Sequence, residues 1–425
     1  MAPPHAPPAG RGRDARIVAL IGTGHFLSHF YMLCLPPLFL AWRQEFDVPY
    51  ATLGLAVALM SGTTAVLQTP VGFLVDRHGA RPFLVGGTLL MALSVAAMAF
   101  APGFWAILAL AVLSGVGNSV IHPADYAILA GSVSKPFTGR AFALHTFTGN
   151  LGFALAPPAI ALMLEGLGMS WRGALLLVGL LGLPVVAAIL LQSRILRDQV
   201  KPKATKQGEA AGPTGRALLL SRPMLLFFAF FLLSAMAGSG IQAWLVTVLG
   251  RLWGTPVLAA SAALTGYMAG ATCGTLVGGW LSDRARRGGL LGMVVALTLG
   301  AIALLLLPGL VPLPEAALAP VLFLGGLALG TSRTPRDVML KDASPPGEVG
   351  KVFGFVSAGL PLGSAITPVP MGLLIDLGHP GLVLPAVAGL LGLSLLCAGG
   401  AQGTARAAAA ARGGGPASRQ VAAAE

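Results

Sequence analysis

The stretch GFLVDRHGAR, residues 72–81, places three ionised side chains between two long apolar segments. Residues 52–71 before it and residues 83–101 after it contain no Asp, Glu, Lys or Arg. A charged side chain costs roughly 2.5–3.5 kcal/mol at the centre of a bilayer on insertion scales. Charges that separate two such runs therefore indicate a loop at a membrane surface, with a membrane-spanning segment on each side of it.

Composition extends this prediction to the whole chain. The 425 residues have a mean hydropathy of +0.81 and only 10% are charged, whereas soluble domains carry about 25%. A helix needs about 20 apolar residues to cross about 30 Å of hydrocarbon. Because the apolar windows are long and do not alternate in polarity, they predict helices rather than a β-barrel. The sequence thus predicts an all-α membrane protein with twelve transmembrane helices, at 17–41, 50–71, 83–101, 104–130, 140–163, 173–192, 223–249, 256–281, 289–309, 316–340, 350–374 and 380–400.

The net charge of +12 would suit a nucleic-acid partner, so the positions of the basic residues have to decide its meaning. With an even number of spans and a cytoplasmic N-terminus, all but three of the 27 Lys and Arg lie on the inner side; the exceptions are Arg43, Arg172 and Arg251. This is the positive-inside distribution. We therefore expect an integral protein of the cytoplasmic (inner) membrane with both termini in the cytoplasm, the lipid bilayer as its surroundings and no nucleic-acid partner.

The remaining composition argues against several kinds of site. Cys34, Cys273 and Cys397 are far apart, and the sequence has no CxxC motif or Cys/His cluster. We therefore expect no disulfide frame, no metal site and no cofactor. The sequence also lacks the run G-x-x-x-x-G-K-[ST] that an ATP-driven pump would need. Residues 1–16 and 401–425, rich in Pro, Gly, Arg or Ala, are expected to be disordered cytoplasmic tails.

The longest polar stretch, residues 192–222, divides the chain into two halves that repeat each other. We expect a six-helix bundle at 17–192, a linker at 193–222 and a second six-helix bundle at 223–400. Parallel repeats of this kind in transporters place the substrate site near the midplane between the halves. Three pairs of segments carry the repeat: GFLVDR (72–77) and GWLSDR (279–284), HPADYAIL (122–129) and TPRDVML (334–340), and GRAFALHTFTGNLGFALAP (139–157) and GKVFGFVSAGLPLGSAITP (350–368).

The pattern G-x-L-x-D-R-x-G-x-R in residues 72–81, with its partial copy at residue 279, resembles the signature loop of the major facilitator superfamily. The twelve spans, the duplication and the basic central loop extend the resemblance over about residues 17 to 400. It implies a transporter that works by alternating access. The His-Pro pair at 122–123 resembles the fosmidomycin-resistance-like branch. The antiporter signature of helix 5 is matched only in part, because Ala156 precedes Pro157 where the signature has Gly.

Ionisable residues inside spans are the first candidates for function, because each is costly to insert. His25 and His29 are four residues apart on the first span and therefore share a helix face. With Ser28 and Tyr31 nearby, they indicate a polar stripe that faces the cavity and binds substrate or protons. Neutral histidines that only bond to a neighbouring helix are the structural alternative, and the sequence leaves it open.

The fourth and fifth spans add further candidates. Asn118, His122 and Asp125 follow one another at i, i+4 and i+7 and share a face. We expect Asn118 and His122 to bind substrate or protons and Asp125, near the cytoplasmic end, to act in a gate. On the fifth span, His145 is also expected to bind substrate or protons. Arg140 is expected at the cytoplasmic edge as a gating or structural residue.

The tenth span contains TSRTPRD, residues 331–337. Arg333 is deep enough to bind substrate, and its planar guanidinium suits a carboxylate, phosphate or phosphonate. Arg336 and Asp337 lie nearer the inner end, so we expect a surface or gate network there. The expected cavity contains several potential cations but no acid at mid-depth, which favours an anionic substrate; the cations are His25, His29, His122, His145 and Arg333.

The signature loops supply the other expected gating residues. The family resemblance places the loop acid at the mouth of the inner gate. Asp76 would then face the start of helix 11, near 347–350, where the helix dipole favours an anion, and Asp283 would face residues 138–139. Asp125 is a candidate partner for a loop arginine. The basic members of this group are Arg77, Arg81 and Arg284.

Glycines repeat every four residues on the eighth span, at Gly266, Gly270, Gly274 and Gly278. Gly350, Gly354 and Ala358 form a similar set on the eleventh. Small residues on one face let helices approach closely. The sequence leaves two interpretations open: a sliding surface between the halves, as the resemblance implies, or static packing.

These observations favour a monomeric secondary active transporter that moves a small anionic organic solute by alternating access, coupled to protons. A drug or toxic-metabolite efflux antiporter is the main alternative. A sensor with a transporter fold is a further alternative. An intramembrane enzyme is remote, because the sequence shows no nucleophile or metal constellation, so we expect no enzymatic activity.

Overall fold

The computed structural model describes residues 11–134, 137–196, 216–284, 289–344 and 349–413, and every regular element in these ranges is helical. The first half contains α1 (Arg11–Leu33), η1 (Pro36–Leu38), α2 (Phe39–Phe46), α3 (Tyr50–His78), α4 (Ala80–Met98), α5 (Phe104–Ser119), α6 (Ile121–Ser132), α7 (Thr138–Ala161), η3 (Leu162–Gly166), α8 (Trp171–Leu180), α9 (Gly182–Leu191) and η4 (Ser193–Ile195). The second half contains α10 (Arg216–Leu219), α11 (Arg222–Trp253), α12 (Val257–Arg284), α13 (Leu290–Leu310), α14 (Glu315–Ala343), α15 (Val349–Ser357), α16 (Gly359–Ile366), α17 (Pro368–Asp376), η6 (Pro380–Leu382) and α18 (Val383–Gly413).

Twelve of these helices or helix series are long and apolar enough to cross a membrane, which confirms the predicted number of spans. The bounds differ at the ends of the chain. Helix α1 begins at Arg11 and α18 continues to Gly413, so residues 11–16 and 401–413 are helical where disorder was expected. At the N-terminal end polar partners compensate for the low hydropathy: Arg16 donates to the Gln192 side chain at 3.0 Å, and buried Asp14 accepts from Ser134.

Proline divides several of the spans into two helices. Proline lacks an N–H and its ring collides with the carbonyl four residues earlier. Helix α5 accordingly ends at Ser119, four residues before Pro123, and α6 follows it. Pro36 and Pro37 end α1 in the same way, and Pro368 begins α17 after a break from α16. These breaks lie inside spans and locally free backbone groups for other partners.

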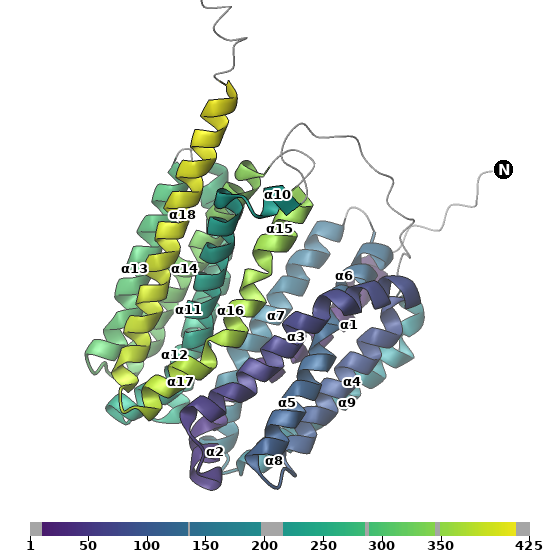
Figure 1. Cartoon of the computed structure of the whole chain (residues 1–425). Helices are drawn as coiled ribbons and strands as arrows, with labels where there is room; N and C mark the ends of the chain where they lie inside the picture. The colour runs from purple at the N-terminus through teal and green to yellow at the C-terminus, as the bar shows by residue number, and fades with distance from the viewer. Residues whose placement is uncertain (1–10, 135–136, 197–215, 285–288, 345–348, 414–425) are drawn as a thin grey trace, which may run out of the picture.

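The two six-span halves lie side by side, with the described ends of the chain at the same end of the molecule (Figure 1). Helix α3 of the first half packs on α16 and α17 of the second, and α7 packs on α12. These are the second, fifth, eighth and eleventh spans, which are the spans that the family resemblance implies for the surface between the halves. The contact between the halves is therefore made by equivalent pairs of helices.

The halves are joined at the end where α3 and α12 begin. The Trp244 ring lies 5.1 Å from Phe39 and 6.0 Å from Tyr50, centroid to centroid, and Thr265 donates to the Ala154 carbonyl at 2.7 Å. One apolar core includes residues of both halves, whereas a second, separate core lies wholly in the second half and includes the starts of α11 and α13. Polar and ring contacts between described residues of the two halves lie at the start of α3 or in the first third of α12, so the molecule is closed at that end.

The glycine stripe of α12 does not face the other half, which contradicts its interpretation as a sliding surface between halves. A Cβ on any of the four glycines would collide with α14 backbone, on carbonyls from Ala319 to Thr331. Gly326 and Gly330 of α14 contact α12 backbone in return. Close backbone approach of this kind permits Cα–H···O contacts between helices. The stripe is therefore static packing within the second half. The structure does not describe the surroundings of Gly350 and Gly354, which belong to the other predicted set.

Replacing Gly270 with Val should destabilise the second half. Its Cβ would meet the Phe323 carbonyl group and the Leu327 backbone nitrogen, and forced overpacking costs about 1–3 kcal/mol. We expect a lower midpoint of thermal unfolding in detergent. Gly279→Val is the matched control on the same helix, because nothing lies within 4 Å of its Cβ position. Equal losses in the two variants would show that helix propensity, and not the contact between α12 and α14, sets the effect.

Candidate functional site

Two adjoining cavities meet at the boundary between the halves. The larger, of about 300 Å³, is lined by α11, α12, α13, α14, α16 and α18 of the second half. The smaller, of about 180 Å³, is lined by α1, η1, α3 and α7 of the first half together with α11 and α16. Ser239, Gln242 and Ser364 line both. A candidate site thus lies between the halves.

Arg333 lines the larger cavity and makes no hydrogen bond or ion pair with any residue that the structure describes. Around it the wall is polar, with the amide of Gln242, the phenol of Tyr267 and several hydroxyl groups. Helix α14 positions the guanidinium, because the close packing of α14 on α12 fixes the helix beside Tyr267. Among the described residues that line the two cavities, none is acidic, which leaves the charge of Arg333 without a partner.

Arg336, for which a surface or gate network was expected, lines the same cavity, and its side chain is only 11% exposed. Asp337 accepts from Nε and Nη2 of Arg336, both at 2.9 Å. The guanidinium also lies over the Phe231 ring, 3.9 Å from its centroid. The Asp337 carboxylate therefore compensates the charge of Arg336, unlike that of Arg333.

Four histidines from three helices form a cluster in the first half: His25 and His29 of α1, His122 of α6 and His145 of α7. The His25 and His145 rings are stacked, 3.7 Å apart and 5° from parallel, and the His25 ring lies 4.4 Å from His29 and 5.0 Å from His122. Gly149 of α7 makes room for the rings, since a Cβ there would lie 2.8 Å from Nδ1 of His29. The face-sharing predicted for α1 is confirmed in this placement.

Hydrogen bonds fix the proton positions in most of the cluster. Nδ1 of His25 lies 2.7 Å from the His145 carbonyl oxygen. Because a carbonyl only accepts, Nδ1 carries a hydrogen, and Nε2 of the neutral ring is left with its lone pair. That Nε2 lies 3.3 Å from Nε2 of His122, so one proton fits between them. Nε2 of His145 donates to Asp125 Oδ2 at 3.0 Å.

The arrangement corrects one expectation from the sequence and reveals one grouping that the sequence did not suggest. Asp125 is fully buried and pairs with His145 instead of a loop arginine. The sequence also gave no sign of a metal-ligating group, yet one ring nitrogen each of His25, His29 and His122 lie within 4.8 Å of one another. Helices far apart in sequence bring them together, so linear spacing could not reveal the grouping.

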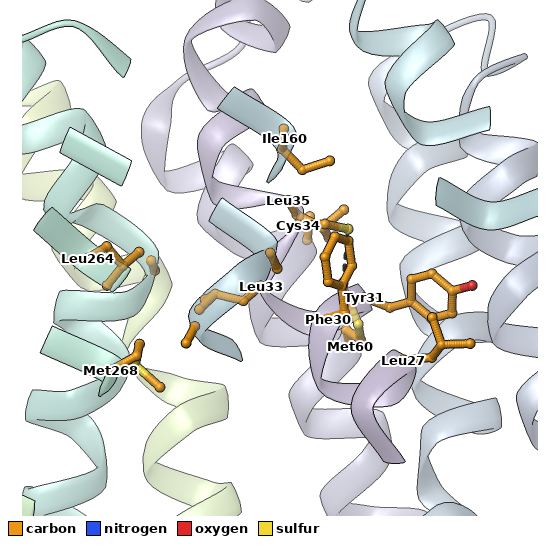
Figure 2. Packing of buried hydrophobic residues seen from close by; sticks show 14 of the residues in the cluster. Leu27, Phe30, Tyr31, Leu33, Cys34, Leu35, Met60, Ile160, Leu264 and Met268 are labelled. Atoms are coloured by element: carbon orange, nitrogen blue, oxygen red, sulfur yellow. Dashed lines mark hydrogen bonds between the residues drawn. The ribbon is translucent and has the colours of Figure 1, made fainter. Parts of the chain in front are cut away.

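Two other candidates lie away from this cluster. The Tyr31 ring is buried, its hydroxyl donates to the Val178 carbonyl at 3.3 Å, and it points away from Leu264 and Met268 of α12 (Figure 2). It belongs to the interior of the first half and not to a cavity-facing stripe. Asn118 donates to Thr64 at 3.2 Å and contacts Met32, because the helix break after Ser119 separates it from His122.

The expected inner gate is described only in part. The structure does not describe the side chains of Asp76 and Asp283, nor those of their proposed partners at 347–350 and 138–139. Arg77 and Arg140 are exposed. Arg81 has a buried Nε without a described hydrogen-bond partner, and Arg284 lies over the Trp280 ring at 4.1 Å. The gating roles of the loop residues therefore stay predictions.

Comparison with known proteins agrees with this geometry. The model of the Major Facilitator Superfamily matches residues 21–256 and 232–419. The chain belongs to the Major Facilitator Superfamily. An uncharacterized MFS-type transporter of Bacillus subtilis, YfnC, is 27% identical over 85% of this chain and 86% of that protein. The fosmidomycin resistance protein of Escherichia coli is 25% identical over 64% of this chain and 66% of that protein.

A solved structure of a bacterial homologue of the human lysosomal transporter Spinster, in an inward-facing and unoccupied conformation, has the same fold. Its TM-score is 0.71 at 14% identity, and the match covers 93% of this chain and 98% of that one. The resemblance to the family, the twelve-span fold and the assignment as a transporter rather than an enzyme are thereby confirmed.

Two acids that the sequence reasoning missed join the halves of this major facilitator protein. Asp376, at the end of α17, accepts from the backbone N–H groups of Tyr50 and Ala51 at 2.7 and 2.8 Å. Glu165, at the end of the fifth span, accepts from Val257 and Leu258 at 2.9 and 2.8 Å. Each carboxylate caps the positive end of a helix in the opposite half. The sequence contains a signal for this pair, because Glu165 and Asp376 are as far apart along the chain as the aligned residues Pro157 and Pro368. The two acids therefore occupy equivalent positions in the repeat.

Removing both interhalf caps, with Asp376→Ala and Glu165→Ala together, should loosen the closed end. Each lost cap weakens closure by about 1 kcal/mol, which is roughly fivefold in an equilibrium constant. We expect a membrane-impermeant thiol reagent to label Ser61→Cys faster from the side where α3 begins, in a background without the three native cysteines. Ser61 lines the cavity between the halves.

Glu45→Ala serves as the control for this labelling experiment. Glu45 lies at the same end but accepts from Trp171 at 2.6 Å and pairs with Arg172, both within its own half. Its loss should leave the labelling rate unchanged. An unchanged rate in the double variant as well would show that the two caps do not hold the halves together.

Proposed function

We propose that this protein is a secondary active transporter that moves a small organic anion by alternating access, coupled to protons. The observation that carries the proposal is the guanidinium of Arg333. It faces a polar cavity at the boundary between the halves without a carboxylate partner among the described residues. A carboxylate or phosphonate would supply the missing charge and two acceptors for the planar fork.

The environment of Arg333 favours an anion over a cation. A cation that loses part of its water without gaining a partner is unfavourable, and Arg336 three residues later adds a second guanidinium to the same wall. Asp337 compensates only one of the two charges. The apolar part of the lining, Phe230, Leu329 and Leu360, suits the carbon skeleton of an organic anion.

Proton coupling is assigned to the histidine cluster. One proton can pass between the facing Nε2 atoms of His25 and His122, 3.3 Å apart, and imidazole is the side chain that ordinarily titrates near neutral pH. His29 links the cluster to the substrate region, because its ring lies 4.2 Å from Phe153, which lines the cavity between the halves. Protonation would thereby alter the wall of the cavity.

The direction of opening follows from the proposed topology. With both termini on the cytoplasmic side of the inner membrane, the end closed by Asp376 and Glu165 is the outer one. The protein would then face inward, as the related-fold Spinster homologue does. The loop residues Asp76 and Asp283 would close the inner end in the opposite state. We assign the bundles 17–192 and 223–400 as the two moving bodies, with residues 193–222 as their linker, in a monomer.

Efflux of a drug or toxic metabolite is the second candidate. The similarity to the fosmidomycin resistance protein of Escherichia coli favours it. The cavity can serve export as well as import, since alternating access has no built-in direction and the coupled gradient sets it. The two candidates differ in the orientation of flux and share Arg333 as the residue that recognises the anion.

Arg333→Gln should weaken anion binding by about tenfold to a hundredfold. A hydrogen bond to a charged group contributes about 1.5–3 kcal/mol, and each 1.4 kcal/mol is tenfold. Small carboxylates, phosphonates and antibiotics are screened by thermal shift on purified protein, and binders are tested for flux in proteoliposomes. Arg333→Lys keeps the positive charge but lacks the planar guanidinium, so its affinity for the anion should lie between those of wild type and Arg333→Gln.

Arg251→Gln, at an exposed position on α11, is the control for charge alone and should behave as wild type. Equal binding and flux in wild type and Arg333→Gln would contradict the assignment of Arg333. A screen in which only organic cations bind would contradict the anionic substrate class.

His29→Ala should uncouple transport from protons. The ring joins the His25 and His122 pair to Phe153, so its loss interrupts the path between the cluster and the cavity. We expect flux driven by an imposed pH gradient to be lost while substrate exchange without a gradient persists, in protein with an unchanged size-exclusion profile. His379→Ala, at an exposed loop position, is the matched control. Normal pH-driven flux in His29→Ala would overturn the assignment.

A further inference from the structure

We propose that His25, His29 and His122 form a binding site for one divalent transition-metal ion of the class that imidazole ligands prefer, represented by Zn²⁺. This inference goes beyond transport, because metal binding does not depend on what the protein carries. It rests on the positions of the three rings, on the hydrogen bond that orients one of them, and on the exposure of the other two.

The distances suit a tetrahedral ion. One ring nitrogen from each of the three histidines lies within 4.8 Å of the others, and the Nε2 atoms of His25 and His122 are 3.3 Å apart. Zinc binds imidazole nitrogen at about 2.0–2.1 Å in tetrahedral geometry, which places two ligand nitrogens about 3.3 Å apart. The pair already has that separation, and the His29 nitrogen, within 4.8 Å of both, would complete three ligands if the His29 ring moved closer to them.

The hydrogen bond of His25 is the one that a ligating histidine needs. Metal-binding histidines usually donate their other ring N–H to a carbonyl or carboxylate, which fixes the ring and leaves the second nitrogen free for the metal. Nδ1 of His25 donates to the His145 carbonyl at 2.7 Å and leaves Nε2 with its lone pair toward His122. His25 is therefore oriented as a ligand without any rearrangement.

The surroundings can hold the charge of the ion and admit it. Asp125 lies behind the cluster, joined to it through His145, and its Oδ1 has no described hydrogen-bond partner. Among the described residues, no Arg or Lys side chain lies over the ring of any of the three histidines. His29 and His122 are partly exposed, and Tyr126 beside His122 is 46% exposed. A water molecule would complete a three-histidine site with one open position.

Metal and protons would compete for the same nitrogens, because a ligating imidazole must be unprotonated. Bound metal would occupy the nitrogens of His25 and His122 between which the proposed function passes its proton. We therefore expect the metal to inhibit pH-driven flux and its affinity to fall as the pH is lowered. This consequence rests on the proposed function, whereas the binding itself does not.

The test is isothermal titration of Zn²⁺ into the purified, metal-stripped full chain, carried on a tag without histidine. We expect one ion per chain in wild type. Affinity should fall by about a hundredfold or more in His122→Gln and in His29→Gln, because loss of a supporting outer-shell group alone costs tenfold to a hundredfold. Co²⁺, whose visible absorption distinguishes four-coordinate from six-coordinate ions, should give a four-coordinate spectrum in wild type only.

Two further variants keep the experiment decisive. The double variant His78→Gln with His379→Gln removes exposed histidines outside the cluster and should bind like wild type. His122→Cys supplies a different ligand atom at the same place and should restore binding. Wild type without a one-ion site, or undiminished binding in His122→Gln, would overturn the metal site. Since no flux enters these measurements, that result would leave the transport proposal standing, and a failure of pH-driven flux would leave the metal site standing.

Discussion

The cost of leaving polar groups unpaired in hydrocarbon governs this structure. Within the spans the backbone is satisfied by helix formation, and many polar side chains bond either to their own helix, as Thr88 does, or to another helix, as His145 does. At the closed end the same rule acts between the halves, where the carboxylates of Asp376 and Glu165 bond the free N–H groups that begin α3 and α12. Several further pairings lie within one half: Asp14 with Ser134, Asn118 with Thr64, Asp125 with His145, and Arg336 with Asp337.

The two halves descend from one repeat but differ in their polar interior. Asp125 and Asp337 occupy equivalent positions in the repeat, and each carboxylate pairs with a basic side chain. In the first half that base is His145, which belongs to the cluster of four histidines. In the second half it is Arg336, which leaves the neighbouring Arg333 uncompensated. The division of labour in the proposed mechanism, protons in one half and an anion in the other, follows from this difference.

The sequence predicted the spans well, because hydropathy over about 20 residues is set by the membrane and not by neighbouring helices. The sequence was less informative about which neighbour each face of a helix contacts. The stripe of Gly266, Gly270, Gly274 and Gly278 predicted a close helix neighbour correctly but could not say which, and the structure shows α14 in place of the other half. The prediction that Tyr31 faces the cavity was wrong for the same reason, because a polar stripe on a helix does not show on which side of the helix the cavity lies.

The sequence by itself determined the class of fold, the number of spans, the duplication and the ionisable residues that deserved attention, since each of these depends on local composition or on comparison of the chain with itself. Only the tertiary structure decided which of those residues meet. His25, His122 and His145 lie on three spans, and their approach depends on the packing of α1, α6 and α7, including the space left by Gly149. A pairing between distant spans has no signature in linear spacing, because helix packing sets the distance and the sequence fixes only the residues that are available for it.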